Sequence, residues 1–222
     1  MKAAAVRAAN APSDWRQAML GCRRCPALVA SRSRVVPGAG SIPAAVVFVG
    51  LAPGRLGGDR TGVPFSGDRS GNLLRSMIAQ AGISSFFITN LVRCNPRDER
   101  GRNRDPTRAE IEHCRSHLAA ELAMVAPSVI VCLGRVAWRE LAGAGANFDP
   151  LKPTPLSVGG RLIYPMYHPA YVNRGACPPH VYAMQFRRLR RLLDRISKRR
   201  PALSGETGRR PRCGAGESAS AD

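Results

Sequence analysis

Short apolar runs, separated by stretches of helical period, dominate the middle of the chain. Four of these runs have the length and composition of strands that a parallel sheet buries on both faces. They are Ala44–Val49, Phe86–Thr89, Ser128–Leu133 and Leu162–Met166. The regular alternation of such runs with helical segments predicts a sheet whose neighbouring strands are joined by helices.

Local signals bound the predicted helices. Thr107-x-x-Glu110 has the form of a capping box, and Gly82 and Gly143 stand where helices commonly end. With Ser13 as a further cap, the predicted helices cover residues 14–21, Asn72–Ala81, 107 to about 125, Val136–Ala142 and Val181–Ile196. The sequence therefore predicts a three-layer α/β fold with a central four-stranded parallel sheet between helices.

The two ends of the chain lack this pattern. Residues 1–12 are rich in Ala, and residues 197–222 are rich in Lys, Arg, Gly, Pro and Ser without hydrophobic periodicity. Both compositions are typical of disordered segments. Because 222 residues suit a single domain with loose ends, we expect one domain over residues 13–196 and a basic disordered tail after it.

Charge narrows the class of partner. Lys and Arg number 34 against 15 Asp and Glu, which gives a formal net charge of +19. Such an excess favours a polyanion such as DNA or RNA as the partner of the protein. The plain alternative, which the charge favours less, is a soluble protein whose many arginines reflect an Arg-rich genome. No segment is long and apolar enough to span a membrane and no signal peptide is apparent, so we expect a cytoplasmic protein, most simply a monomer.

Four segments follow the predicted strands directly, which is where an α/β fold places its ligands. They are Gly50–Gly71, Asn90–Cys94, Gly134–Arg135 and His168–Arg174. The first is Gly-rich, but it has the spacing of neither a P-loop nor a dinucleotide fingerprint. Its length without regular structure favours a functional loop over an ordinary surface loop.

The cysteines suggest a metal site. Cys22-x-x-Cys25 is followed far downstream by Cys94 and Cys114, and four thiolates can hold either zinc or an iron–sulfur cluster. The plain alternative is a set of unrelated core cysteines, which suits Cys132 inside an apolar strand.

Taken together, these motifs resemble the iron–sulfur uracil-DNA glycosylases, over roughly residues 21–193. The matching stretches are Cys22-x-x-Cys25, GLAPG (Gly50–Gly54), GVPFSGDRSG (Gly62–Gly71), ITNLVRC (Ile88–Cys94), the helix with Cys114, VIVCLGR (Val129–Arg135) and YHPAY (Tyr167–Tyr171). They occur in the order of the family. The resemblance implies an enzyme that flips uracil out of DNA and hydrolyses its N-glycosidic bond. It also implies that the protein is associated with the bacterial nucleoid.

The resemblance is divided between two branches of that family. Leu51 stands where family 4 carries an acidic residue, so GLAPG is closer to the broader-specificity family 5, which would add bases such as hypoxanthine. HPAYVNR (His168–Arg174) is closer to family 4. The loss of an acid at Leu51 also keeps open a second function, that of a non-catalytic nucleic-acid-binding protein with a structural metal site.

The resemblance also implies roles for single residues. Those expected to bind the base are Gly50, Ala52, Pro53, Gly54, Phe65 as the stacking ring and Asn90 as the reader of the base edge. Those expected in catalysis are Asp68, His168 and, as the second choice of carboxylate, Asp59. Those expected to enter the DNA are Tyr171, Val172, Asn173 and Arg174. Those expected to hold a structural [4Fe–4S] cluster are Cys22, Cys25, Cys94 and Cys114.

Overall fold

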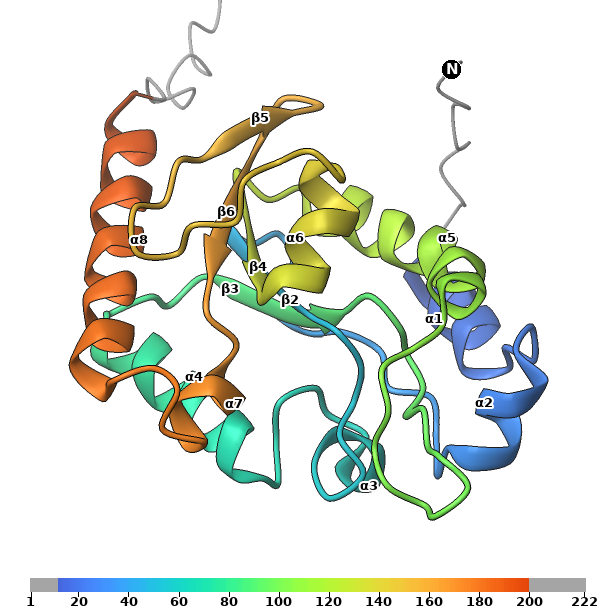
Figure 1. The fold of residues 1–222 in the computed structure, drawn as a ribbon. Coiled ribbons are helices and arrows are strands. Elements are labelled where there is room, and N and C mark those ends of the chain that lie inside the picture. The colour runs from blue at the N-terminus through green and yellow to red at the C-terminus, as the bar shows by residue number, and fades with distance from the viewer. Residues whose placement is uncertain (1–11, 200–222) are drawn as a thin grey trace, which may run out of the picture.

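The computed structural model describes residues 12–199, and these form a mixed six-stranded sheet in the order β1-β3-β2-β4-β6-β5. The strands are β1 (Ala39–Gly40), β2 (Val46–Gly50), β3 (Phe86–Asn90), β4 (Val129–Leu133), β5 (Leu156–Val158) and β6 (Arg161–Met166). Strands β3, β2, β4 and β6 are parallel neighbours. Their carboxyl ends therefore lie at one edge of the sheet (Figure 1).

The predicted α/β class and the four predicted parallel strands are confirmed. The predicted number of strands in the sheet is corrected from four to six. Two antiparallel strands extend the sheet: β1 pairs with β3, and β5 pairs with β6. These edge strands contain two and three residues, which is too short for a periodic signal in the sequence.

Helices cover both faces of the sheet, as Figure 1 shows. They are α1 (Pro12–Leu20), α2 (Pro26–Ser31), α3 (Gly58–Thr61), α4 (Arg69–Gln80), α5 (Arg108–Val125), α6 (Arg135–Ala142), α7 (Pro169–Asn173) and α8 (Pro179–Arg199). The short helices α2, α3 and α7 were not expected from the sequence. None of the helices in the described part of the chain has the length and apolar character needed to cross a bilayer.

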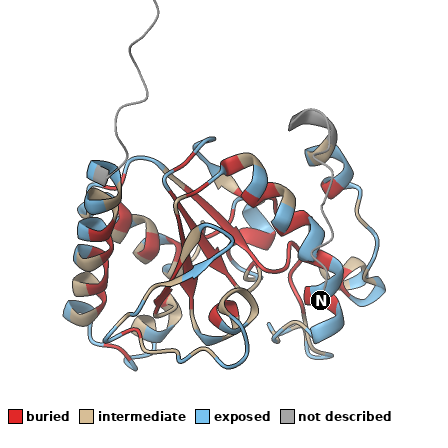
Figure 2. Cartoon of the chain, turned by 90° about the horizontal axis from the view of Figure 1, so that it is seen from above, coloured by how far each residue is buried: buried red, intermediate tan, exposed pale blue. Residues whose placement is uncertain are grey.

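The central strands separate two hydrophobic layers. On β2, Val47 and Val49 face a core formed with α1, α2, α5 and α6, whereas Val46 and Phe48 face a core formed with α4 and α8. Every residue of β2 is buried, and Figure 2 shows the buried strands between half-exposed helices. This two-sided burial explains why the strands read as continuous apolar runs.

Helix ends agree with most of the sequence signals. The Thr107 capping box is present at the start of α5, with Thr107 accepting from Glu110 N–H and the Glu110 carboxylate accepting from Thr107 N–H. Ser13 is not a cap, because α1 already begins at Pro12. The predicted last helix, Val181–Ile196, is too short at both ends, since α8 spans Pro179–Arg199. Most of the predicted loose segments 1–12 and 197–222 lies outside the described residues, but Pro12 belongs to α1 and residues 197–199 belong to α8.

Candidate active site

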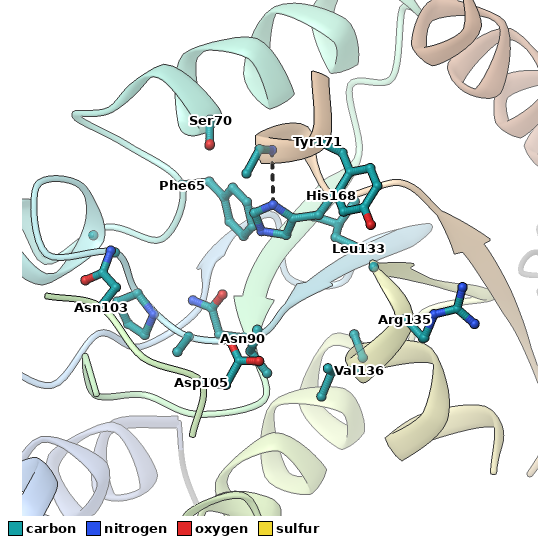
Figure 3. A pocket seen from close by; sticks show the side chains of 18 of the residues that line it. Phe65, Ser70, Asn90, Asn103, Asp105, Leu133, Arg135, Val136, His168 and Tyr171 are labelled. Carbon is teal, nitrogen blue, oxygen red and sulfur yellow. Dashed lines mark hydrogen bonds between the residues drawn. The ribbon is translucent and has the colours of Figure 1, made fainter. Parts of the chain in front are cut away.

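A cavity of about 770 Å³ opens at the carboxyl ends of the parallel strands. Each of these strands contributes to its wall: Leu51 to Gly54 follow β2, Asn90 ends β3, Leu133 and Gly134 end β4, and Tyr167 and His168 follow β6. The four segments selected from the sequence therefore meet at one place (Figure 3).

Phe65 forms one wall of the cavity. Its ring packs on the core beneath α4 and lies 5.5 Å, centroid to centroid, from the imidazole of His168. The backbone of Phe65 has φ of +49°, in the left-handed region that non-glycine residues rarely adopt. A Cβ on Gly50 would lie 2.6 Å from the Phe65 ring, so glycine at this position leaves room for the ring. Gly50 thus supports the cavity from below, while Ala52, Pro53 and Gly54 line it.

Asn90 presents a buried amide to the cavity. The residue is 1% exposed, and its Oδ1 atom has no hydrogen-bond partner within the described part of the chain. An unpaired polar atom in such a position is costly unless a ligand satisfies it. Figure 3 shows Asn90 at the end of its strand, below Phe65 and His168 in this view. This arrangement fits a group that reads the edge of a bound base.

His168 stands at the start of α7 with one ring nitrogen already engaged. Its Nδ1 accepts the backbone N–H of Ala170 at 3.1 Å. Burial, reinforced by the positive charge of Arg174, lowers the pKa of His168 from 6.5 to about 4. The imidazole is therefore neutral at physiological pH, and its single proton resides on Nε2. His168 is consequently a hydrogen-bond donor toward the cavity.

Asp68 and Asp59 occupy different environments. Asp68 lines the cavity and caps α4, accepting the N–H of Gly71 through Oδ1 at 2.7 Å. Its Oδ2 lies over Gly57, where a Cβ would approach to 2.1 Å. Asp59 is fully buried outside the cavity lining and forms an ion pair with Arg97 at 2.6 Å. Of the two carboxylates, Asp68 therefore faces the cavity, whereas Asp59 is paired with Arg97 outside the cavity lining.

The α7 segment offers one exposed side chain. Tyr171 is 45% exposed, stacks on Tyr167 and lies beneath the guanidinium of Arg174. Val172 packs against the core, and Asn173 donates to Ser70 Oγ on α4 at 3.2 Å. Of the residues expected to enter DNA, Tyr171 and Arg174 line the cavity.

A second, smaller cavity brings together the four cysteines selected from the sequence. Cys22, Cys25, Cys94 and Cys114 all line it and carry free thiols. Arg32 donates to Cys94 Sγ at 3.1 Å, although burial still raises the pKa of that thiol to about 11. Among the described residues, no group of three or more His, Cys, Asp or Glu is arranged to hold a single metal ion.

Several polar residues around the cavity had no signal in the sequence. Asp105 lines the cavity. Arg93 is buried in an ion pair with Glu121 and donates to the carbonyl of Asn90. Arg75 donates to the carbonyls of Pro64 and Phe65. In an Arg-rich chain, the sequence does not distinguish an arginine that supports the cavity from one that is only a surface charge, because the distinction depends on what the side chain contacts.

Comparison with known proteins identifies the family of the chain. A model of the uracil DNA glycosylase superfamily matches residues 37–190. A type-4 uracil-DNA glycosylase of Archaeoglobus fulgidus is 35% identical over 199 residues, covering 83% of this chain and 93% of the relative. A type-5 uracil-DNA glycosylase of Pyrobaculum aerophilum is 33% identical, covering 72% of this chain and 83% of the relative. A type-5 uracil-DNA glycosylase of Thermus thermophilus is 32% identical, covering 71% of this chain and 86% of the relative. The chain is therefore a member of the uracil-DNA glycosylase superfamily.

Proposed function

We propose that this protein is a monofunctional DNA glycosylase that removes uracil from DNA and leaves an abasic site. The observation that carries the proposal is the convergence of Phe65, Asn90, Asp68 and His168 on one cavity at the carboxyl ends of the parallel strands. The names of the type-4 and type-5 relatives support the same substrate. The cavity lining contains no Lys among the described residues, which suits hydrolysis rather than Schiff-base chemistry.

Recognition begins with a flipped nucleotide, because uracil within a duplex is stacked and out of reach. The exposed ring of Tyr171 is suited to fill the gap left in the helix. The flipped base stacks on Phe65, and the Asn90 amide reads its edge. The unpaired Oδ1 of Asn90 accepts uracil N3–H, and its Nδ2 donates to uracil O4.

Cleavage of the bond between C1′ and N1 sends the bonding electron pair to the base and leaves a positively charged sugar. Each charge requires a preorganised counter-group. The Nε2–H of neutral His168 donates to uracil O2, where negative charge builds. The Asp68 carboxylate stabilises the sugar cation and orients the water whose oxygen adds to C1′. The proton that this water loses passes to solvent, and the departing uracil anion takes up a proton from solvent.

Base range is tested with single-stranded and duplex oligonucleotides that carry one uracil, one hypoxanthine or one thymine. Alkaline cleavage of the abasic strand reports excision on a denaturing gel. We expect cleavage with uracil and none with thymine, whose C5 methyl group needs extra space in the pocket. Cleavage with hypoxanthine would place the protein functionally with family 5, and its absence would place it with family 4.

We further propose that Cys22, Cys25, Cys94 and Cys114 hold a structural [4Fe–4S] cluster. The residues fit such a group: they supply four sulfur donors around one cavity and are free of disulfides. The backbone N–H of Arg93 and the guanidinium of Arg32 lie within reach of two of the sulfur atoms. The cluster would hold the segment around α2 against α5 and the loop after β3, and no step of base excision depends on it.

This cofactor proposal predicts a brown protein with broad visible absorption. Replacing Cys22 with Ser should remove most of the colour and lower the melting temperature, because metal binding and folding are coupled in such sites. Cys177→Ser is the matched control, since Cys177 is buried outside the cysteine cavity and should leave the spectrum unchanged. A colourless wild-type protein that contains one zinc after anaerobic purification would contradict the proposal.

DNA binding should depend strongly on salt. Arg135 and Arg174 are exposed at the cavity, and the chain has a formal charge of +19. Neutralising phosphates releases counterions, so log affinity should fall linearly with log salt, by at least about tenfold between roughly 50 and 200 mM. Fluorescence anisotropy with a fluorescein-labelled duplex measures this slope. A flat dependence would show that the charge is not used on phosphate.

A further inference from the structure

Arg75 reaches from α4 to the backbone beside the stacking ring. Its Nε donates to the carbonyl of Phe65 at 2.7 Å, and its Nη2 donates to the carbonyl of Pro64 at 2.8 Å. The side chain is half-buried and takes part in no ion pair found among the described residues. The planar fork of the guanidinium is therefore used on two consecutive carbonyls rather than on a carboxylate.

The carbonyls that Arg75 binds flank an unfavourable backbone conformation. Phe65 has φ of +49°, whereas most non-glycine residues avoid the left-handed region because Cβ crowds the following carbonyl. The same carbonyl packs closely against Gly71, where a Cβ would lie 2.4 Å from the Phe65 carbonyl carbon. The phenylalanine backbone is thus held against α4 by a close glycine and a two-pronged donor from the same helix.

We propose that Arg75 is a positioning residue for base stacking, which acts by holding Phe65 in its left-handed conformation with the ring facing His168. This inference rests on the proposed function of the cavity as a uracil site. The helix α4 then organises two parts of that site, because the residue that precedes it is Asp68, whose carboxylate caps it. Without the two hydrogen bonds, the backbone of Phe65 relaxes toward ordinary φ values and the ring leaves the stacking position.

The test is a double-mutant cycle with Arg75→Met and Phe65→Ala, measured with both DNA and free uracil. Met keeps an unbranched side chain but has no N–H donor. Arg75→Met should lower the single-turnover rate on uracil DNA, and weaken the affinity for free uracil measured by calorimetry, by about 5- to 30-fold, which corresponds to the cost of a left-handed non-glycine residue. In the Phe65→Ala background the same change should have almost no further effect, because the ring that Arg75 positions is absent.

Three controls separate positioning from general damage. Affinity for a duplex with an abasic site, which has no base to stack, should be unchanged by Arg75→Met. Arg139→Met, which removes the same charge from an exposed position on α6, should keep the wild-type rate. Arg75→Lys should fall between wild type and Arg75→Met, because an ammonium group donates without the planar fork. It also provides a second test if Arg75→Met lowers the melting temperature below the assay temperature.

The proposal is overturned if the fold-losses of Arg75→Met and Phe65→Ala multiply in the double mutant. It is also overturned if Arg75→Met weakens binding of abasic DNA as much as binding of uracil, or if Arg75→Met alone has no effect. Affinity for free uracil is measured without catalysis. A wild-type protein that leaves uracil DNA intact would therefore contradict the proposed enzyme, while the cycle on free uracil would still decide the role of Arg75.

Discussion

Replacing Asp68 with Asn is expected to lower the single-turnover rate of uracil excision by about 100- to 1000-fold, with little change in affinity for uracil DNA. Negative charge at this position matters chiefly when the sugar becomes cationic, so its loss should appear in the chemical step rather than in binding. The substitution preserves the local fold, because Asn is as good a helix cap as Asp and can accept the same Gly71 N–H. Rapid-quench kinetics with enzyme in excess, and anisotropy measured in parallel, separate the two quantities.

Asp59→Asn is the matched comparison in the same loop. Asp59 is buried against Arg97 and outside the cavity, so its replacement should reduce the free energy of unfolding more than the excision rate of the folded protein. Full activity of Asp68→Asn together with loss in Asp59→Asn would show that the wrong carboxylate had been assigned. Full activity of both would leave His168 and backbone groups to carry the reaction.

Replacing His168 with Ala should produce a loss of similar size, about 100- to 1000-fold in single-turnover rate, since a preorganised donor at the departing base is removed. Because the pKa of His168 is about 4, the imidazole is already neutral at pH 6. The wild-type rate should therefore show no step in the usual histidine range, between about pH 5.5 and 8. A fall in rate with an apparent pKa near 6.5 would contradict a neutral donor.

The lowered pKa of His168 also sets the direction of a stability change. Above about pH 6.5 the imidazole is neutral in both folded and unfolded chains and has no effect on pH dependence. Below about pH 6.5 His168 of the unfolded chain binds a proton, whereas His168 of the folded chain binds one only near pH 4. The free energy of unfolding therefore falls as the pH is lowered from about 6.5 to about 4. His168→Ala should make denaturant midpoints less sensitive to acid between those two pH values.

The parallel sheet and the position of the cavity could be predicted from the sequence because both depend on local patterns. Strands that are buried on both faces appear as apolar runs, and ligand sites follow the carboxyl ends of such strands. Asn90 and His168 stand immediately at or after strand ends, which identifies them as candidates. The cysteines were found by spacing and are brought together by the fold.

Features that depend on contacts between distant segments had no such signal. The preference for Asp68 over Asp59 rests on the ion pair of Asp59 with Arg97, which comes from the loop after β3. The role of Arg75 depends on the backbone conformation of Phe65, which a sequence does not reveal for a non-glycine residue. The edge strands were missed because hydrogen bonding to a neighbour, rather than hydrophobic periodicity, defines them.

The most direct test of a uracil-excising cavity is to identify the molecule that it releases. Purified protein in excess over a duplex with a single uracil should liberate one equivalent of free uracil, measured by mass spectrometry, and leave an intact strand with one abasic site. The Asp68→Asn protein should release it about 100- to 1000-fold more slowly while binding the same duplex. Tight binding of the duplex by the wild-type protein without release of uracil would contradict the account and indicate a non-catalytic DNA-binding protein.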